Sequence, residues 1–269
     1  MIGSSSKNTL PDKISHQSSP ANREYKYIKS AKQETSESTY MGKERNMASK
    51  NEVKIEWIGH SCFLISLNDS IKIVTDPFDK SVGYPTPDVT ADVCLVSHDH
   101  FDHNYVSVVK GKPQVVKGTG EKEAKQIKFK GVASFHDEQE GSQRGKNTIF
   151  TWGLGGIKFA HAGDLGADLS PAQLKEIGAV DVLFIPVGGF YTIDAKVATK
   201  LVANLNPKVV IPMHYKMPFM GANFPIATVD EFLKGKESVI KAGKSQVSFN
   251  KESLPKTTTI YVLEYKKDK

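Results

Sequence analysis

The segment Val93-Cys-Leu-Val-Ser-His-Asp-His-Phe-Asp-His103 joins an apolar run to a dense group of ligand-type side chains. Its first five residues predict a buried β-strand. His98 and His100 are two residues apart, so on an extended backbone their side chains share one face. Asp102 and His103 follow where the chain must turn, which lets them reach a neighbouring point. Four such side chains within six residues suit two adjacent metal ions better than one.

Short apolar runs recur outward from this segment and are separated by turn residues, as is typical of β-strands. The predicted strands are Val53–Trp57, Cys62–Leu67, Ile71–Thr75, Val93–Ser97, Val132–Phe135, Thr148–Trp152, Ile157–His161, Val182–Val187, Val209–Pro212 and Thr259–Leu263. No internal repeat with a fixed spacing is visible.

Helices are predicted between the later strands. Ser170 is able to cap a helix that begins at Pro171 and ends at Gly178. A second helix is predicted over Ala195–Leu205, and a third begins at Thr228. Strands first, then strands alternating with helices, indicate a layered protein of α-helices and β-sheets.

The net charge of the 269 residues is +6, but it is unevenly distributed. Residues 1–50 carry nine Lys and Arg against five Asp and Glu, and they contain no sustained apolar period. They are expected to form a disordered, basic, Ser- and Lys-rich tail. The nearly neutral remainder, residues 51–269, lacks the charge excess typical of a nucleic-acid-binding protein.

No segment of the sequence predicts a membrane span or a secretory signal. Apolar runs reach only about ten residues, whereas a bilayer span needs about twenty, and the first residues lack the apolar stretch of a signal peptide. Cys62 and Cys94 each lie inside a β-like apolar run, which favours buried thiols over a disulfide or a metal ligand. We therefore expect a cytoplasmic protein.

Three further ligand candidates each follow a predicted strand. They are His136, Asp164 and His214. Rigid scaffolds often place chemical groups at such strand ends. Each is weak evidence alone, because a lone His at a strand end is more often a structural residue, but together they complete a set.

His98-x-His100-x-Asp102-His103, followed by His136, Asp164 and His214, resembles the five metal-binding motifs of the metallo-β-lactamase superfamily. The resemblance covers residues 53–265. It implies an α+β fold, a four-layer αβ/βα sandwich with the site at one edge between the two sheets. Residues 51–269 are accordingly expected to form one metallo-β-lactamase-like hydrolase domain.

The short sequence segments around these motifs resemble those of one branch of that superfamily, the small Zn-dependent hydrolases. This branch includes ascorbate-6-phosphate lactonases and, more distantly, the N-acyl-phosphatidylethanolamine phospholipase D. The segments are Trp57-Ile-Gly-His60-Ser, Thr75-Asp76-Pro77-Phe78, His161-Ala-Gly-Asp164, Ile185-Pro-Val-Gly188 and Pro212-Met-His214-Tyr215.

The resemblance implies two groups of metal ligands that share one carboxylate. They are His98, His100 and His136 for the first ion, Asp102, His103 and His214 for the second, and Asp164 between them. Imidazoles and carboxylates suit two Zn²⁺ ions, with Mn²⁺ or Fe²⁺ as alternatives. A hydroxide that bridges the metals would be the nucleophile, with catalytic roles for Asp102 and Asp164.

Five other residues are candidates for holding a ligand in place or contacting substrate. The resemblance implies that Asp76 orients a ligand His, with a simple turn cap as the alternative. For His161, three residues before Asp164, a hydrogen bond to a ligand and a plain structural role are both open. His60 lies in a predicted turn, where a place at the edge of the site and a structural role are both open. Tyr191 and Tyr215 each follow a site-bearing strand and are able to donate a phenol hydrogen bond, although packing is an alternative for both.

The function implied is a dinuclear metal-dependent hydrolase acting on a small ester, lactone or phosphodiester. One alternative is a phosphodiesterase for phospholipids or nucleotides, and another is a non-catalytic metal-binding sensor or scaffold. A small-molecule substrate is the expected partner, and no nucleic acid is expected. A homo-oligomer stays open, with the apolar stretch Met217–Phe224 as an interface or as a pocket wall.

Overall fold

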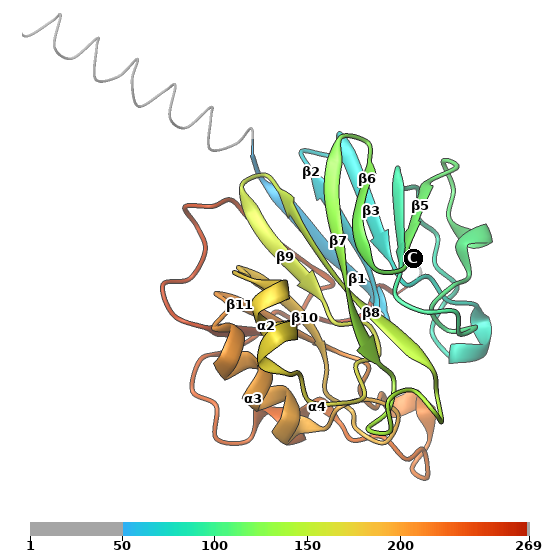
Figure 1. Ribbon diagram of the computed structural model, residues 1–269, viewed down its shortest axis with the longest axis vertical. Helices are drawn as coiled ribbons and strands as arrows, with labels where there is room; N and C mark the ends of the chain where they lie inside the picture. The colour runs from blue at the N-terminus through green and yellow to red at the C-terminus, as the bar shows by residue number, and fades with distance from the viewer. Residues whose placement is uncertain (1–50, 268–269) are drawn as a thin grey trace, which may run out of the picture. The chain divides into compact units, whose positions relative to one another are not determined.

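The part of the chain that the computed structural model describes, residues 51–267, is built around two β-sheets (Figure 1). The disorder predicted for residues 1–50 concerns residues outside that part. The sequence predicts an α+β fold in the form of a four-layer αβ/βα sandwich, and the α+β class and the sandwich of two sheets with helices are confirmed.

The first sheet has six strands in the order β13-β1-β2-β3-β4-β5. Their bounds are β1 Val53–Gly59, β2 Cys62–Leu67, β3 Ile71–Thr75, β4 Val93–Val96, β5 Gln114–Lys117 and β13 Gln246–Phe249. The pairs β13–β1, β1–β2 and β2–β3 are antiparallel, whereas β3, β4 and β5 are parallel to one another. The carboxyl ends of β3 and β4 therefore lie at one edge of this sheet.

The second sheet has eight strands in the order β12-β14-β11-β10-β9-β8-β7-β6. Their bounds are β6 Gly120–Ala124, β7 Ile127–Phe135, β8 Lys146–Leu154, β9 Ile157–His161, β10 Val182–Pro186, β11 Val209–Met213, β12 Val239–Lys241 and β14 Thr259–Val262. β9, β10 and β11 are parallel. β7 runs in the same direction as β9, because both are antiparallel to β8. The carboxyl ends of these four strands thus share an edge.

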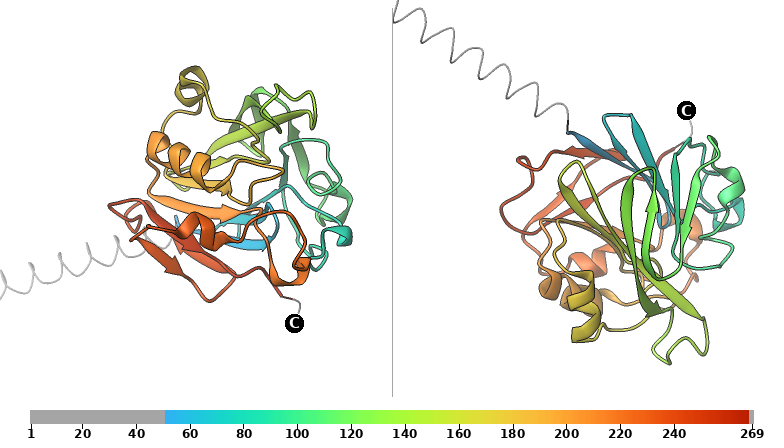
Figure 2. Two further views of the ribbon diagram at one scale, coloured as in Figure 1. Left: turned by 90° about the horizontal axis from the view of Figure 1, so that it is seen from below. Right: turned by 45° about the horizontal axis from the view of Figure 1, so that its top comes forward.

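Three α-helices lie among the described residues, α2 Pro171–Ile177, α3 Ala195–Leu205 and α4 Val229–Leu233. The predicted cap of α2 is present, because the Ser170 hydroxyl accepts a hydrogen bond from the Gln173 backbone and Gln173 accepts one from the Ser170 backbone. Asp194 caps α3. Figures 1 and 2 show α2 and α3 on the face of β9, β10 and β11 that is turned away from β1. No helix within residues 51–267 is long and apolar enough to cross a membrane.

The main core lies between the two sheets. Phe63 of β2 and Phe184 of β10 are both fully buried, and their ring centres are 4.4 Å apart. Trp152 and Phe159, from the neighbouring strands β8 and β9, stack with the Phe184 ring. These aromatic contacts hold the two sheets together next to the edge where the strands end.

A second, smaller core covers the outer face of the six-stranded sheet. It contains Cys62 and Cys94, which are buried and free as the sequence predicts. Burial raises the pKa of both thiols. Among the described residues, this outer layer consists of connections with the 3-10 turns Lys80–Val82 and Val106–Val108 and contains no α-helix.

Candidate metal centre

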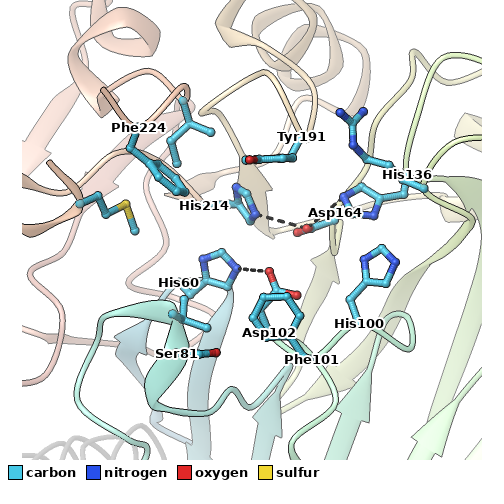
Figure 3. A pocket seen from close by; sticks show the side chains of 14 residues that line it. His60, Ser81, His100, Phe101, Asp102, His136, Asp164, Tyr191, His214 and Phe224 are labelled. Atoms are coloured by element: carbon cyan, nitrogen blue, oxygen red, sulfur yellow. Dashed lines mark hydrogen bonds and ion pairs between the residues drawn. The ribbon is translucent and has the colours of Figure 1, made fainter. Parts of the chain in front are cut away.

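Ligand-type side chains follow strands of both sheets at the edge where the strands end. The segment His98–His103 follows β4 of the six-stranded sheet, whereas His136, Asp164 and His214 follow β7, β9 and β11 of the other. The structure brings all seven predicted ligands together, as Figure 3 shows for five of them. Parallel strand direction within each sheet explains why residues so far apart in sequence meet.

The carboxylate of Asp164 lies at the centre of this cluster. Its Oδ2 atom is 3.1 Å from His103 Nε2 and 3.2 Å from Nε2 of both His136 and His214. His98 Nε2 lies 4.0 Å from the same oxygen. One oxygen atom therefore contacts imidazoles of both predicted ligand groups.

The structure gathers the predicted ligands of each group within a short distance of one another, with one addition to the second group. The ligand atoms of His98, His100 and His136 lie within 4.8 Å of one another. The second group is formed by His60, Asp102, His103 and His214, whose ligand atoms also lie within 4.8 Å of one another. For His60, the sequence leaves a place at the edge of the site and a structural role open, and the structure places its Nε2 atom 3.3 Å from Asp102 Oδ2.

Several polar atoms of the cluster are buried without a hydrogen bond. They include His98 Nε2, His136 Nε2 and Asp164 Oδ1, which have no hydrogen-bond partner among the described residues. Leaving such a group unsatisfied costs about 1–3 kcal/mol, so their accumulation at one point needs an explanation. Imidazole nitrogens and carboxylate oxygens aimed at a shared space fit a divalent cation.

The electrostatics of the cluster also fit a cation. Burial, reinforced by the neighbouring His103, lowers the pKa of His98 to about 3 and keeps its imidazole in the neutral form that binds metals. Burial opposes ionisation of Asp164, but His103 and His214 outweigh it and hold its pKa well below the usual value. Burial also disfavours a charge on His103, yet Asp164 and Asp76 raise its pKa. Asp164 therefore carries a negative charge at the centre of the cluster, where it pairs with His103.

Asp76 holds His103 in position from behind. Its Oδ2 atom accepts a hydrogen bond from His103 Nδ1 at 3.0 Å, which leaves Nε2 of the same ring directed at Asp164. Ser97 fixes this carboxylate by donating its backbone N–H at 2.8 Å and its hydroxyl at 2.6 Å. The contact is the one expected of a residue that orients a metal ligand.

Replacing Asp76 with Asn is expected to weaken metal binding by about 10–100-fold, the usual cost of losing such a support. The carboxylate accepts from His103 and the Ser97 hydroxyl with one oxygen and from the Ser97 backbone N–H with the other, whereas the amide has only one acceptor oxygen and loses at least one of these bonds. A chelator-competition titration measures the affinity directly. Asp69→Asn is a matched control, because Asp69 is exposed and pairs with Lys54. Equal affinities for the Asp76 variant and the control would contradict the supporting role.

Residues 54–214 match the family profile of the beta-lactamase superfamily domain. The chain belongs to the metallo-β-lactamase superfamily. A UPF0173 metal-dependent hydrolase of Carboxydothermus hydrogenoformans is 31% identical over 194 residues, which are 61% of this chain and 84% of the relative. A second, from Archaeoglobus fulgidus, is 27% identical over 240 residues, covering 74% of this chain and 100% of the relative.

Solved structures give the same result. A proposed Zn-dependent hydrolase of this superfamily from Thermotoga maritima has a TM-score of 0.67 and 42% sequence identity, over 80% of this chain and 100% of that one. A metallo hydrolase from Ignicoccus hospitalis shares the fold, with a TM-score of 0.52 at 23% identity over 74% of this chain and 99% of that one. The present chain is therefore a metal-dependent hydrolase.

The side chains of three less certain candidates, His161, Tyr215 and Tyr191, lie in three different places. His161 points into the fold, where its Nε2 atom donates to the Ser61 carbonyl at 2.9 Å and its Nδ1 atom accepts from the Gly163 backbone. Tyr215 packs its ring against Trp57 and does not line the cavity at the metal cluster, so the structure gives no support for a substrate contact. Tyr191 does line that cavity.

Two glycines allow the strand ends to approach one another. A Cβ atom added to Gly166 would lie 2.2 Å from the backbone carbon of His136, and one added to Gly188 would lie 2.3 Å from the backbone oxygen of His214. Backbone atoms cannot yield as the end of a flexible side chain can. These glycines therefore set the positions of two predicted ligands, and no motif singled them out for that role.

A cavity of about 420 Å³ opens beside the cluster of predicted metal ligands. Its lining contains candidates that the sequence identified, namely His60, His100, Asp102, His136, Asp164, Tyr191 and His214. Of the other lining side chains, Met220 and Phe224 lie in the stretch Met217–Phe224, which the sequence offers as an interface or a pocket wall. Ser81, Val82 and Ile226 lie in the connections Phe78–Asp88 and Lys216–Ile226, which the sequence indicates as pocket loops without naming a residue. Sequence reasoning missed Phe101, which lies within the first motif, and Arg144, whose connection carries no recognisable pattern.

Proposed function

We propose that this hydrolase holds two divalent metal ions and cleaves a small ester, lactone or phosphodiester. The single observation that carries the proposal is the position of Asp164, whose Oδ2 atom lies 3.1 Å from His103 and 3.2 Å from His136. These two imidazoles belong to different ligand groups, so one carboxylate is able to serve both ions. Zn²⁺ suits the donor set best, with Mn²⁺ or Fe²⁺ as alternatives.

The proposed ligand assignment follows the two clusters and the shared carboxylate. His98, His100 and His136 would hold the first ion, Asp102, His103 and His214 would hold the second, and Asp164 would serve both. Metal ions bound here would supply an activated water as nucleophile and stabilise the negative charge that develops on the substrate.

Asp102 and Asp164 are the proposed catalytic residues. Asp102 is only partly buried, with 21% of its side chain exposed toward solvent. His60 donates to its Oδ2 atom and thereby fixes the carboxylate at the cavity wall. In this position Asp102 is able to accept a hydrogen bond from the attacking water and orient it.

The cavity suits a small organic molecule. Its volume of about 420 Å³ lies within the ordinary range of small-molecule sites, about 300–1,000 Å³. Met220, Phe224 and Ile226 give it an apolar wall, which excludes water around the reacting bond. A cytoplasmic location stays a prediction from the sequence.

Hydrolysis assays on three substrate classes test the proposal. The panel contains p-nitrophenyl esters, lactones and bis-p-nitrophenyl phosphate, and His100→Ala provides the background. We expect the wild type to hydrolyse at least one class and the variant to fall to background. Metal-loaded wild type that hydrolyses none of the three would contradict the proposal and favour a metal-binding sensor or scaffold. Activity confined to the phosphodiester would select the phosphodiesterase alternative over a lactonase-like enzyme.

A further inference from the structure

Arg144 is a charged residue of the cavity that the proposed chemistry does not use. It is the only arginine in residues 51–267. It is also the only Lys or Arg among the described residues that line the cavity, whose lining includes His136 and Tyr191. A cationic side chain next to a hydrolytic centre is a candidate for binding part of the substrate.

The guanidinium group of Arg144 has no acidic partner among the described residues. Among residues 51–267 its side chain forms no ion pair and no hydrogen bond, although it is half-buried. Its central carbon lies 5.5 Å from the ring centre of Tyr191 and 6.0 Å from that of Phe190. Stacking on aromatic rings steadies a guanidinium and leaves its N–H donors free for a ligand.

The side chain of Arg144 is not needed to hold its own loop. The carboxylate of Asp137 does so by accepting backbone hydrogen bonds. The donors are Gln139 at 2.8 Å, Gly141 at 2.9 Å, Gln143 at 3.0 Å and Arg144 at 2.7 Å. Because Asp137 directly follows the predicted ligand His136, the loop is fixed relative to the metal cluster. The backbone of Arg144 is therefore held in place relative to the predicted metal ligands, and its guanidinium group is free to bind a ligand.

We infer that Arg144 is a specificity-determining residue, which binds an anionic group of the substrate while the scissile bond lies over the metal cluster. The planar guanidinium matches a carboxylate or a phosphate through two parallel hydrogen bonds. The inference rests on the hydrolase function proposed above and narrows its substrate class to small anionic molecules. The uncharged part of such a substrate would contact the apolar wall formed by Met220, Phe224 and Ile226.

A matched pair of esters tests this inference through activity. The probes are 4-nitrophenyl butyrate, which is neutral, and the mono-4-nitrophenyl ester of glutaric acid, which carries a carboxylate. We expect Arg144→Met to lower kcat/KM for the anionic ester by about 10–100-fold, mainly through KM, and to leave the neutral ester unchanged. Arg144→Lys should retain part of the preference, because it keeps the charge but loses the planar fork.

Lys146→Met is the matched control. Lys146 carries the same charge two residues further on, is exposed, and does not line the cavity. It should leave the preference for the anionic ester as it is in the wild type. An equal loss for both esters in Arg144→Met, or an equal loss of preference in both Met variants, would overturn the inference.

Direct binding separates this inference from the proposed function. Metal-free protein is titrated calorimetrically with glutarate and with methyl phosphate, so no hydrolysis is required. We expect wild type to bind at least one of these anions about tenfold or more tightly than Arg144→Met. The better of the two identifies the anionic group as carboxylate or phosphate. Equal binding by wild type and variant overturns the role of Arg144, even if esters are hydrolysed, whereas an absence of hydrolysis with Arg144-dependent binding contradicts only the proposed function.

Discussion

Replacing Asp164 with Asn is expected to reduce kcat/KM by more than about 100-fold and to release at least one metal ion per chain. Residues that only support a ligand already cost up to about 100-fold in affinity or activity when lost, and Asp164 contacts both ligand groups directly. The chain should stay folded, because Asn keeps the volume of the side chain and the cluster lies at the sheet edge, above the aromatic core. Elemental analysis, steady-state kinetics and circular dichroism measure the three effects.

Asp168→Asn is the control for this prediction. Asp168 lies on the same connection after β9, but its side chain is 42% exposed and pairs with Lys200. The same chemical change there should leave metal content and activity at wild-type levels. An Asp164 variant that retains both metals at full occupancy would refute the bridging role.

Replacing Phe184 with Ala is expected to lower the free energy of unfolding by about 3–5 kcal/mol, the usual cost of deleting a fully buried aromatic ring. The ring is 0% exposed and joins the two sheets through Phe63. Its removal leaves a cavity that Trp152 and Phe159, fixed on neighbouring strands, cannot fill. Urea denaturation followed by circular dichroism measures the change.

Phe190→Ala makes the same substitution at a position that is 61% exposed. Its free energy of unfolding should change by no more than about 0.5 kcal/mol. Similar losses in the two variants would show that Phe184 is not a central contact between the sheets.

Two kinds of strand were predictable from the sequence. They are strands buried on both faces and strands in which buried and exposed residues alternate clearly. β2 and β3 begin and end at the predicted residues, and β4 and β10 are one residue shorter than predicted. β6 was missed because its sequence, Gly120-Glu-Lys-Glu-Ala124, is charged and mostly exposed at the end of its sheet. Such a strand forms through pairing with β7, which local sequence does not reveal.

The metal cluster was predictable because its residue types are rare and their order carries the family resemblance. Its three-dimensional supports were not. His60 joins the second group from a turn in which its own φ is 50°, a left-handed conformation that the sequence does not predict. Arg144 comes from a loop whose path depends on the backbone contacts of Asp137. Tyr215 follows a site-bearing strand, yet its ring packs against Trp57 instead of reaching the cavity.

Metal content per chain is the most direct test of the central claim, that one cluster holds two ions. Elemental analysis is made on protein purified without added metal, in parallel with His100→Ala. We predict about two ions per chain in the wild type and a clear loss in the variant, with the metal identified in the same measurement. A metal content near zero in both proteins would contradict the dinuclear centre and the hydrolytic chemistry proposed for it.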